Sequence, residues 1–413
     1  MTAVEWQLDS VVGPSHHYAG LSLGNTASMA NQYQVSSPKQ AALEGLKKMK
    51  TLHDMGVPQL VFPPHPRPVL SDYEVTGDRL SALYSSSSMW MANAGVITPS
   101  SDTLDRKVHF TPANLSTLFH RSLETDHTGS LFKRSFSDPD VFVHHAPLPS
   151  VLSDEGAANH TRFCVDYGSK GVHFFVYGVS YEGDRFPARQ SLDACHHIVR
   201  QHGIDSDSVV FAQQSRKAID AGVFHHDVIG VGNHSLLLCH ELAYEDPQQV
   251  YDVLQATFQR VCGRPLDIRV IKESELSLED AVGSYFFNSQ LVTLEDHGMC
   301  LILPQRCQGY PSVMDLVSRL LKGDSPIEKV VYVPLDQSMR NGGGPACLRL
   351  RLVLNDKESS CIDSRILFTE SRYERLVQVV EETYLESLTV HDLKDPEVLA
   401  QIQVGYKAVS LFG

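Results

Sequence analysis

One cysteine stands directly after a glycine-rich turn. The stretch "NGGGPACLRLRLVL" runs from Asn341 to Leu354, and its leucines alternate with Cys347, Arg349 and Arg351. Because side chains alternate across a strand, this pattern predicts a leucine core face with Cys347 on the polar face. Glycines leave room for a ligand, and nearby positive charge lowers a thiol pKa and favours the nucleophilic thiolate. The stretch indicates a reactive thiol or a plain turn, whereas the phosphate-loop pattern is absent.

A histidine and an aspartate two residues apart form a second candidate group. In "GVFHHDVIGVG", an extended backbone from His225 to Val231 would project His225 and Asp227 to one side and His226 to the other. Histidine exchanges protons near neutral pH, so His225 is a candidate general acid and base. A hydrogen-bonded structural histidine is the alternative, and we assign it to His226. No H-E-x-x-H or spaced Cys/His set favours a metal site.

Two adjacent acids, Asp154 and Glu155, precede a glycine in "SDEGAANHTR". A carboxylate can bind a guanidinium through paired hydrogen bonds. Acids at a helix N-terminus also complement the helix dipole, and the local pattern favours that interpretation. Because adjacent side chains point in different directions in most backbones, we expect only one of the two to serve a site.

A glycine-punctuated polar segment, "SHHYAGLSLGNTAS", lies near the start of the chain. It is typical of a binding loop that opens and closes, or of an ordinary surface loop. Arg121 and Arg189, in "HRSLE" and "PARQ", can pair with carboxylates of a ligand or remain solvated. A thiol, a histidine and a carboxylate without a metal motif together indicate covalent thiol catalysis.

The composition limits the kinds of partner. The chain has 413 residues, 42% hydrophobic and 20% charged, which is typical of a globular protein with a large core. A formal net charge of -14 argues against nucleic acid or an anionic membrane as partner. No run reaches the roughly 18 apolar residues of a membrane span, and the first residues lack a signal-peptide core. Eight scattered cysteines without a C-x-x-C pair favour reduced thiols in the cytoplasm.

Helix and strand patterns alternate along the chain, which predicts an α/β fold. No repeat, linker or domain boundary is readable. A hairpin is predicted to turn at Asn233 and His234, between strands at 227–232 and 235–240. The other predicted elements are helices at 37–56, 191–203, 246–263, 310–322 and 364–388, and strands at 172–180, 208–214, 266–271, 299–304, 329–335 and 346–354.

These motifs resemble those of the N-succinylarginine dihydrolase family of the arginine succinyltransferase pathway. That family belongs to the guanidine-modifying enzymes, or penteins. The resemblance implies one catalytic domain over residues 1–413, a pseudo-fivefold α/β propeller with a central active site. The matching segments, in family order, are "HHYAGLSLGN", "KVHFTPANL", "FHRSLE", "DEGAANH", "FPARQ", "GVFHHDV", "FNSQL" and "NGGGPACLRL".

The resemblance also implies a role for each matching residue. Cys347 would be the nucleophile, His225 the general acid and base, and Glu155 the third catalytic residue, while Asp227 would bind the guanidinium. The remaining substrate-binding positions would be the loop residues Ala19, Gly20, Leu21, Ser22, Leu23, Gly24, Asn25, Thr26, Ala27 and Ser28, together with Asn93, His120, Arg121, Arg189 and Asn341.

The implied reaction converts N2-succinyl-L-arginine and two water molecules to N2-succinyl-L-ornithine, two ammonia and carbon dioxide, without metal or cofactor. A homodimer is also implied. One alternative is a deiminase that stops at the ureido product. A thiol amidohydrolase or protease would use the same residue types on amides, and a binding protein that keeps the pocket would release no ammonia.

Overall fold

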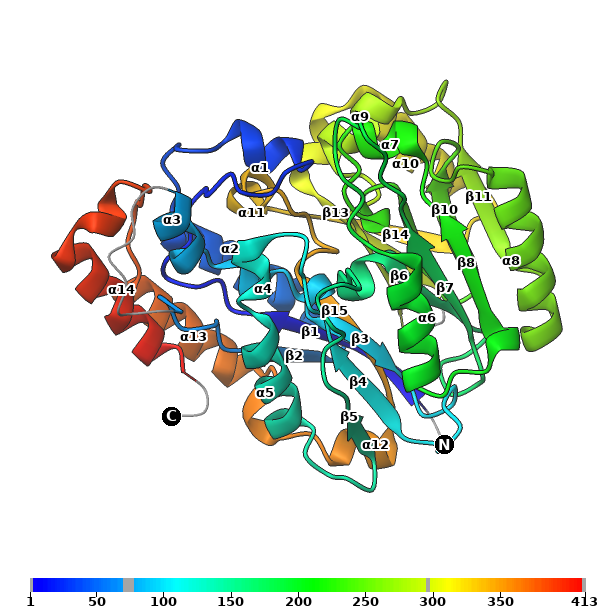
Figure 1. Cartoon of the computed structure of the whole chain (residues 1–413), viewed down its shortest axis with the longest axis horizontal. Helices are drawn as coiled ribbons and strands as arrows, with labels where there is room; N and C mark the ends of the chain where they lie inside the picture. Colours follow the sequence, from blue (N-terminus) through cyan, green and yellow to red (C-terminus); the bar gives the residue numbers. More distant parts are fainter. Residues whose placement is uncertain (1–2, 70–77, 295–297, 411–413) are drawn as a thin grey trace.

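The computed structural model describes residues 3–69, 78–294 and 298–410, and this part of the chain is built from short strands and helices (Figure 1). The strands are β1 (Ala3–Ser10), β2 (Gln59–Phe62), β3 (Gly95–Thr98), β4 (Val108–Pro112), β5 (Phe142–His144), β6 (His160–Phe163), β7 (Val172–Tyr177), β8 (Val209–Gln213), β9 (Gly230–Asn233), β10 (Leu236–His240), β11 (Asp267–Ile271), β12 (Gln290–Thr293), β13 (Met299–Pro304), β14 (Ile327–Val333) and β15 (Arg349–Asn355). The helices are α1 (Thr26–Ala30), α2 (Pro38–Asp54), α3 (Asp78–Tyr84), α4 (Phe119–Ser122), α5 (Thr125–Ser135), α6 (Leu192–Gln201), α7 (Arg216–Asp220), α8 (Pro247–Cys262), α9 (Leu278–Ser284), α10 (Pro311–Lys322), α11 (Asp336–Arg340), α12 (Asp356–Ser360), α13 (Glu370–Thr383) and α14 (Pro396–Ala408).

The strands of the described residues form five three-stranded sheets with one shared plan. In each sheet the central strand is antiparallel to one neighbour and parallel to the other. A helix lies in sequence between the two parallel strands, as a parallel connection requires. The five sheets, in strand order, are β15-β1-β2, β3-β4-β5, β6-β7-β8, β9-β10-β11 and β12-β13-β14.

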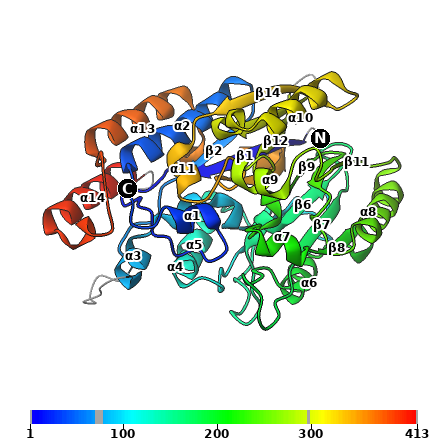
Figure 2. The ribbon, with the colours of Figure 1, turned by 90° about the horizontal axis from the view of Figure 1, so that it is seen from above.

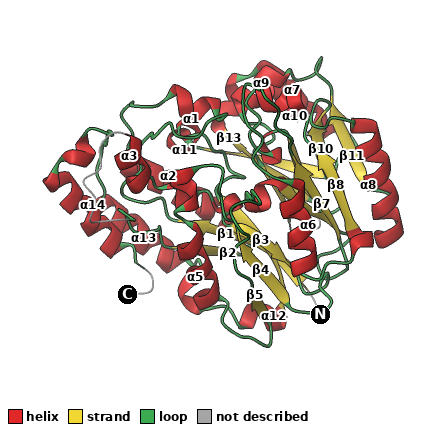
Figure 3. Cartoon of the chain, in the orientation of Figure 1, coloured by secondary structure: helices red, strands yellow, loops and turns green. Residues whose placement is uncertain are grey.

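Among the described residues the last strand, β15, pairs with the first, β1, in the sheet β15-β1-β2. The register of β1 and β15 runs from Ala3 opposite Asn355 to Asp9 opposite Arg349. Strand β6 contacts β9, β9 contacts β12, and β15 contacts β3. The strands β3, β6, β9, β12 and β15 are called the inner strands below. Figure 2 shows α6, α8, α10 and α13 toward the outside, and Figure 3 shows the strands between helices.

Local sequence signals account for several elements. Ser37 caps α2 by accepting a hydrogen bond from the Gln40 backbone, and Pro38 occupies the first turn. Helix α8 has a matching cap at Asp246 and ends at Gly263, whose φ of 75° suits glycine. Leucines alternate along β15 and are buried, which confirms the predicted core face.

Two predicted boundaries are wrong because tertiary contacts decide them. The helix predicted at 364–388 is a short 3₁₀ turn followed by α13, since Leu367 bridges to Leu60 and the Phe368 amide bonds Gln59. The hairpin turns one residue later than predicted. Asn233 pairs with Leu236, which leaves His234, with a φ of 49°, in the loop. Helix α14 was not predicted.

The helices and the cysteines can also be compared with the predictions from composition. In the part that the structure describes, no helix is long and apolar enough to cross a membrane. All eight cysteines are free thiols, and six of them are buried. Free cysteine commonly packs as a small hydrophobic residue, and these six do so.

Candidate active site

Cys347 lies two residues before β15 rather than within the strand, and it is 3% exposed. Three glycines precede it in a tight, buried turn. Gly342 has a φ of 100°, which favours glycine, and a Cβ on Gly343 would lie 2.2 Å from the Trp90 ring. A Cβ on Gly344 would lie 2.8 Å from Asn288 Oδ1. At Gly343 and Gly344, protein side chains therefore fill the room that the sequence suggested for substrate.

The Cys347 thiol lies between a hydrogen-bond donor and a carboxylate. Asn288 Nδ2 donates to Sγ at 3.2 Å, and the thiol donates to Asp227 Oδ2 at 3.6 Å. Burial and the negative charge of Asp227 raise the pKa of Cys347 well above its ordinary value. The expectation of a lowered thiol pKa is wrong for the protein without substrate. A neutral thiol is favoured until a cation approaches Asp227.

His225 and Glu155 form a buried pair in the same region. His225 Nε2 lies 2.8 Å from Glu155 Oε2. Because an ionised carboxylate only accepts hydrogen bonds, Nε2 carries the proton and Nδ1 is left as the basic nitrogen. Nδ1 has no hydrogen-bond partner among the residues that the structure describes. Burial alone would raise the pKa of Glu155, but the hydrogen bond and charge of His225 lower it to about 2.

Polar side chains from other segments fix the position of Glu155. The Thr117 hydroxyl donates to Glu155 Oε1 at 2.5 Å, and Gln190 Oε1 accepts from the Glu155 backbone amide at 2.7 Å. Asn93 Nδ2 donates to the Glu155 carbonyl at 2.7 Å. Asn93 therefore holds the backbone of a catalytic candidate and also lines the pocket. Sequence reasoning missed Thr117 and Gln190. Thr117 stands two residues before the motif "FHRSLE", and Gln190 is the last residue of "FPARQ".

The neighbouring acid, Asp154, has a different role. Its Oδ1 accepts hydrogen bonds from the Gly156 amide and from Gln190 Nε2, both at 3.2 Å. Burial raises its pKa to about 6. Asp154 supports the turn, while Glu155 pairs with His225, so one acid of the two serves the pair, as the sequence predicted.

The backbone after His225 is not extended. Residues His226–Val228 form a 3₁₀ turn, and the His225 carbonyl accepts from the Val228 amide. His225 then reaches Glu155 while Asp227 reaches Cys347, so the two side chains serve different partners. His226 is buried with Nε2 2.9 Å from the Tyr244 hydroxyl, the structural position assigned to it.

A pocket of about 460 Å³ brings most of the predicted residues together. Glu155 and Asp227 are not in its wall but contact residues that are. Among the loop positions, Gly20, Leu23, Gly24, Thr26 and Ala27 also lie outside it. The wall contains the predicted Ala19, Leu21, Ser22, Asn25, Ser28, Asn93, His120, Arg121, Arg189, His225, Asn341 and Cys347, with Ser85, Ser87, Trp90, Phe224 and Gly342 in addition.

Arg189 ties the N-terminal loop to the pocket. Its guanidinium donates to the Leu23 carbonyl at 2.6 Å and to Ser22 Oγ at 3.2 Å, and it lies 5.0 Å from the Phe224 ring centre. Asn25 Nδ2 donates to the Gly342 carbonyl at 2.7 Å, which fixes the same loop to the glycine turn. The loop is therefore anchored at both walls of the pocket.

Two further predicted residues are buried in the wall. Burial lowers the pKa of Arg121 to about 10, although the charge of Glu155 opposes this. His120 also has a lowered pKa, because it is buried beside the charges of Arg121 and Arg189. At neutral pH these conditions keep His120 uncharged and leave Arg121 cationic, which suits the binding of an anionic group.

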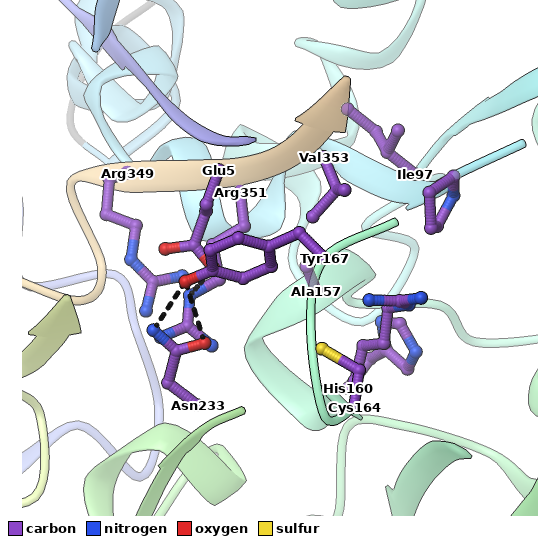
Figure 4. Close-up of a pocket in the computed structure, with 12 residues that line it drawn as sticks. Glu5, Ile97, Ala157, His160, Cys164, Tyr167, Asn233, Arg349, Arg351 and Val353 are labelled. Carbon is purple, nitrogen blue, oxygen red and sulfur yellow. Dashed lines mark hydrogen bonds and ion pairs between the residues drawn. The ribbon is translucent and has the colours of Figure 1, made fainter. Parts of the chain in front are cut away.

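A second cavity, of about 560 Å³, includes Arg349 in its wall (Figure 4). Arg349 and Arg351 project into it from β15, opposite the hydrogen-bonded side chains of Tyr167 and Asn233. Arg351 pairs with Glu5 at 3.5 Å. Arg349 attracts Asp227 and lowers the pKa that burial raises there. The positive charge of Arg349 in this cavity therefore stabilises the ionised form of Asp227.

The fold is similar to that of two solved structures. The N-terminal domain of ArgZ bound to product, from an arginine dihydrolase of the cyanobacterial ornithine–ammonia cycle, matches with a TM-score of 0.55 at 16% identity, over 84% of this chain and 97% of that one. Unliganded AgrE matches with a TM-score of 0.55 at 16% identity, over 86% of this chain and 41% of that one. The chain has a mixed α/β fold of small sheets, which it shares with these two proteins.

Sequence relatives define the family. The N-succinylarginine dihydrolase of Marinobacter nauticus is 46% identical, and that of Paraburkholderia xenovorans is 44% identical. Each alignment covers 97% of this chain and 95% of the relative. The family model for succinylarginine dihydrolase matches residues 2–411. The chain belongs to the succinylarginine dihydrolase family, as its motifs predicted.

Proposed function

We propose that this chain hydrolyses N2-succinyl-L-arginine to N2-succinyl-L-ornithine, two ammonia and carbon dioxide in arginine catabolism, with Cys347 as covalent nucleophile. The observation that carries the proposal is the pairing of Cys347 Sγ with the Asp227 carboxylate at 3.6 Å, beside the His225–Glu155 pair. A thiol, a carboxylate and a proton carrier that converge on one pocket suit attack on a guanidinium carbon.

The substrate itself activates the thiol. A guanidinium that pairs with Asp227 neutralises the charge that raises the pKa of Cys347. The thiol proton is then lost more easily, and the thiolate forms next to its electrophile. The buried site therefore avoids a standing thiolate, and reaction with other electrophiles stays slow while no substrate is bound.

The first passage exchanges one amino group for oxygen. The Cys347 thiol passes its proton to His225 Nδ1, and the thiolate attacks the central carbon. His225 Nδ1 then donates that proton to one nitrogen, which leaves as ammonia. An amidino group remains bound to sulfur. His225 then removes a proton from water, the hydroxide attacks the same carbon, and the carbon–sulfur bond breaks. The product of this passage is the ureido compound N2-succinyl-L-citrulline.

A second passage completes the reaction at the same residues. Attack of the thiolate on the ureido carbon expels the second ammonia, and water then releases a carbamate from sulfur. The carbamate loses carbon dioxide and leaves the amine of N2-succinyl-L-ornithine. Glu155 holds the proton of His225 Nε2 and stabilises the imidazolium in both passages. No step requires a metal ion or a cofactor.

The succinyl and carboxylate groups bind at the cationic wall. Arg121 and Arg189 supply guanidinium groups that form paired hydrogen bonds with carboxylates. His120, Asn341, Asn93 and the loop 19–28 complete the wall. Arg189 is held by the carbonyl of Leu23, so a carboxylate that recruits Arg189 also draws this loop over the pocket. The loop thereby covers the substrate.

The architecture supports a wider proposal. The five sheets are the blades of a pseudo-fivefold propeller whose inner strands surround the active site, and residues 1–413 form one catalytic domain. Shared strand order in every sheet and the β1–β15 pairing support this arrangement. The enzyme acts on its small substrate in the cytoplasm as a homodimer.

One assay tests the function. The protein is incubated with N2-succinyl-L-arginine or with free arginine, and ammonia is counted per substrate consumed. We expect two ammonia with succinylornithine from the first substrate and none from arginine. One ammonia with a succinylcitrulline product would identify a deiminase instead. Cys347→Ser should abolish both steps without lowering the thermal midpoint, and retention of most activity would refute the nucleophile.

A further inference from the structure

The buried side-chain amide of Asn288 contacts the Cys347 thiol, the glycine turn before it and the Asp227 backbone. Asn288 is fully buried, at 0% exposure, between α9 and β12. Its Nδ2 donates to Cys347 Sγ at 3.2 Å and lies 3.3 Å from the Asp227 carbonyl, to which it also donates. Its Oδ1 accepts from the Gly344 amide at 2.9 Å and from the Cys347 amide at 3.4 Å. The same side chain thus holds the glycine turn and contacts the thiol.

Asn288 occupies a position that recurs before each of the five inner strands. A short segment before each inner strand contributes a polar side chain to the region around the pocket. Those side chains are Asn93 before β3, Glu155 before β6, Asp227 before β9, Asn288 before β12 and Cys347 before β15. The motifs assign a role to four of these residues, and Asn288 is the fifth.

Hydrogen bonds connect the five segments into a closed ring. Asn93 donates to the Glu155 carbonyl, and the next link is His225 with Glu155. Asn288 donates to the Asp227 carbonyl, which links the segments before β9 and β12. The ring closes through two backbone bonds, from the Ala346 amide to the Asn288 carbonyl at 3.2 Å and from the Ala92 amide to the Cys347 carbonyl at 3.1 Å.

We propose that Asn288 is a positioning residue of the reaction: its side-chain amide aims Cys347 Sγ at the substrate and stabilises the thiolate when the proton leaves. Before substrate binds, Sγ accepts from Asn288 and donates its proton to Asp227. Once a guanidinium occupies Asp227, the amide N–H remains as the donor to sulfur. A hydrogen bond to an ion is stronger than one to a neutral group, so the contact strengthens on ionisation.

The other charges that face Cys347 do not replace this donor. Asp227 opposes ionisation of the thiol. Arg121 and Arg189 favour it through their charge, without a hydrogen bond to the sulfur in the described part of the structure. Tyr285, at the end of α9, is uncharged at neutral pH because burial raises its pKa. Among the described residues, Asn288 is therefore the side chain that donates to Sγ, and the Gly344 backbone amide favours the thiolate beside it.

Alkylation of the protein without substrate measures the proposed effect. Iodoacetamide reacts with the thiolate, so the rate at a fixed pH of about 8 reports how much thiolate Cys347 forms. The rate is followed by mass spectrometry of the peptide that contains Cys347. We expect Asn288→Ala to react about three- to tenfold more slowly than the unchanged protein, since a donor to an ion is lost.

A merely structural role would give the opposite result. If Asn288 only braced the glycine turn, its removal would loosen the turn, expose Sγ and leave alkylation unchanged or faster. Asn233→Ala is the matched control, because Asn233 is also a buried amide beside an inner strand's end but does not contact Cys347. We expect this control to alkylate Cys347 at the rate of the unchanged protein.

Turnover supplies the second readout. The proposal rests on the function proposed above, and it predicts that Asn288→Ala lowers kcat with succinylarginine about tenfold or more while KM changes little. Should Asn288→Ala fail to fold, Asn288→Ser answers the same question, since its hydroxyl is too short to reach Sγ. A folded variant with unchanged or faster alkylation would overturn the proposal. If the protein does not hydrolyse succinylarginine, the proposed function fails, and alkylation still decides the role of Asn288.

Discussion

Asp227 has two opposed effects, and the substitution Asp227→Asn separates them. The carboxylate raises the pKa of Cys347 in the free protein, and in the proposed mechanism it binds the guanidinium in the complex. The two groups lie 3.6 Å apart. At an effective dielectric constant of about 20, a charge at this distance contributes roughly 4 to 5 kcal/mol, or about three pK units. Removal of the charge should lower the pKa of Cys347 by up to that amount.

The expected change in reactivity follows from two terms. A pKa lower by about three units raises the thiolate fraction about a thousandfold at pH 8, while the more acidic thiolate is about twentyfold less nucleophilic. The net ceiling is about a 50-fold faster alkylation, and we expect at least about fivefold. Turnover should move the other way, because loss of a buried partner of the guanidinium costs about 3 kcal/mol or more, a factor of at least about one hundred in kcat/KM.

The assay is the alkylation time course of the Cys347 peptide in the absence of substrate. Cys262 and Cys361 are partly exposed, so their modification in the same sample calibrates the reagent. Asp154→Asn is the matched control, since Asp154 is also a buried carboxyl but has no contact with sulfur. Alkylation of Asp227→Asn at the unchanged rate or more slowly would refute the electrostatic account of the thiol.

Three further predictions follow from the same geometry. Glu155→Gln leaves His225 without its carboxylate, so kcat should fall about a hundredfold or more in steady-state kinetics, and a loss below tenfold would contradict the role of the pair. Arg189→Gln should raise KM for succinylarginine about ten- to a hundredfold with a smaller change in kcat, and an unchanged KM would contradict carboxylate binding. Asp154 has a pKa of about 6 against an ordinary 3.8, so the folded state binds more protons and loses stability as the pH rises through that window. Asp154→Asn should therefore raise the free energy of unfolding at about pH 8 by up to about 3 kcal/mol, measured by denaturant unfolding, and change it little below pH 4. An unchanged free energy of unfolding at pH 8 would contradict the destabilising effect of the buried Asp154 charge.

Much of the site could be predicted because its residues stand in short, ordered motifs. Cys347, His225, Glu155 and Asp227 were singled out by residue type, and the family resemblance implied the role proposed for each of them. The leucine alternation of β15 and the caps of α2 were readable because they depend on neighbours in sequence. Local periodicity and capping therefore predicted the strand that follows Cys347 and the helix α2.

Other features depend on contacts that no local pattern encodes. The raised pKa of Cys347 results from burial and from Asp227, which lies far away in sequence. Gln190 and Asn288 act through single amides whose partners lie far from them in the sequence. Trp90 lines the pocket only because the segment after α3 folds against the glycine turn. The motif "FNSQL" around Asn288 was visible, but no residue type in it suggested catalysis.

The repeat in the fold was also hidden from sequence reading. The five sheets share strand order and direction, yet their strands share no evident residue pattern. Strand pairing conserves backbone geometry rather than side-chain identity, so the repetition becomes visible only in the register. The pairing of β1 with β15 joins segments that lie more than 300 residues apart in the sequence, a contact that periodicity does not predict.

The central claim is that Cys347 forms a covalent bond with the guanidino carbon. The most direct test is to quench the enzyme during turnover of N2-succinyl-L-arginine and to measure the mass of the intact protein and of the Cys347 peptide. We predict an adduct equal to succinylarginine less one ammonia, located on Cys347 and absent from Cys347→Ser. Rapid turnover with no adduct at Cys347, or an adduct on another residue, would contradict the account.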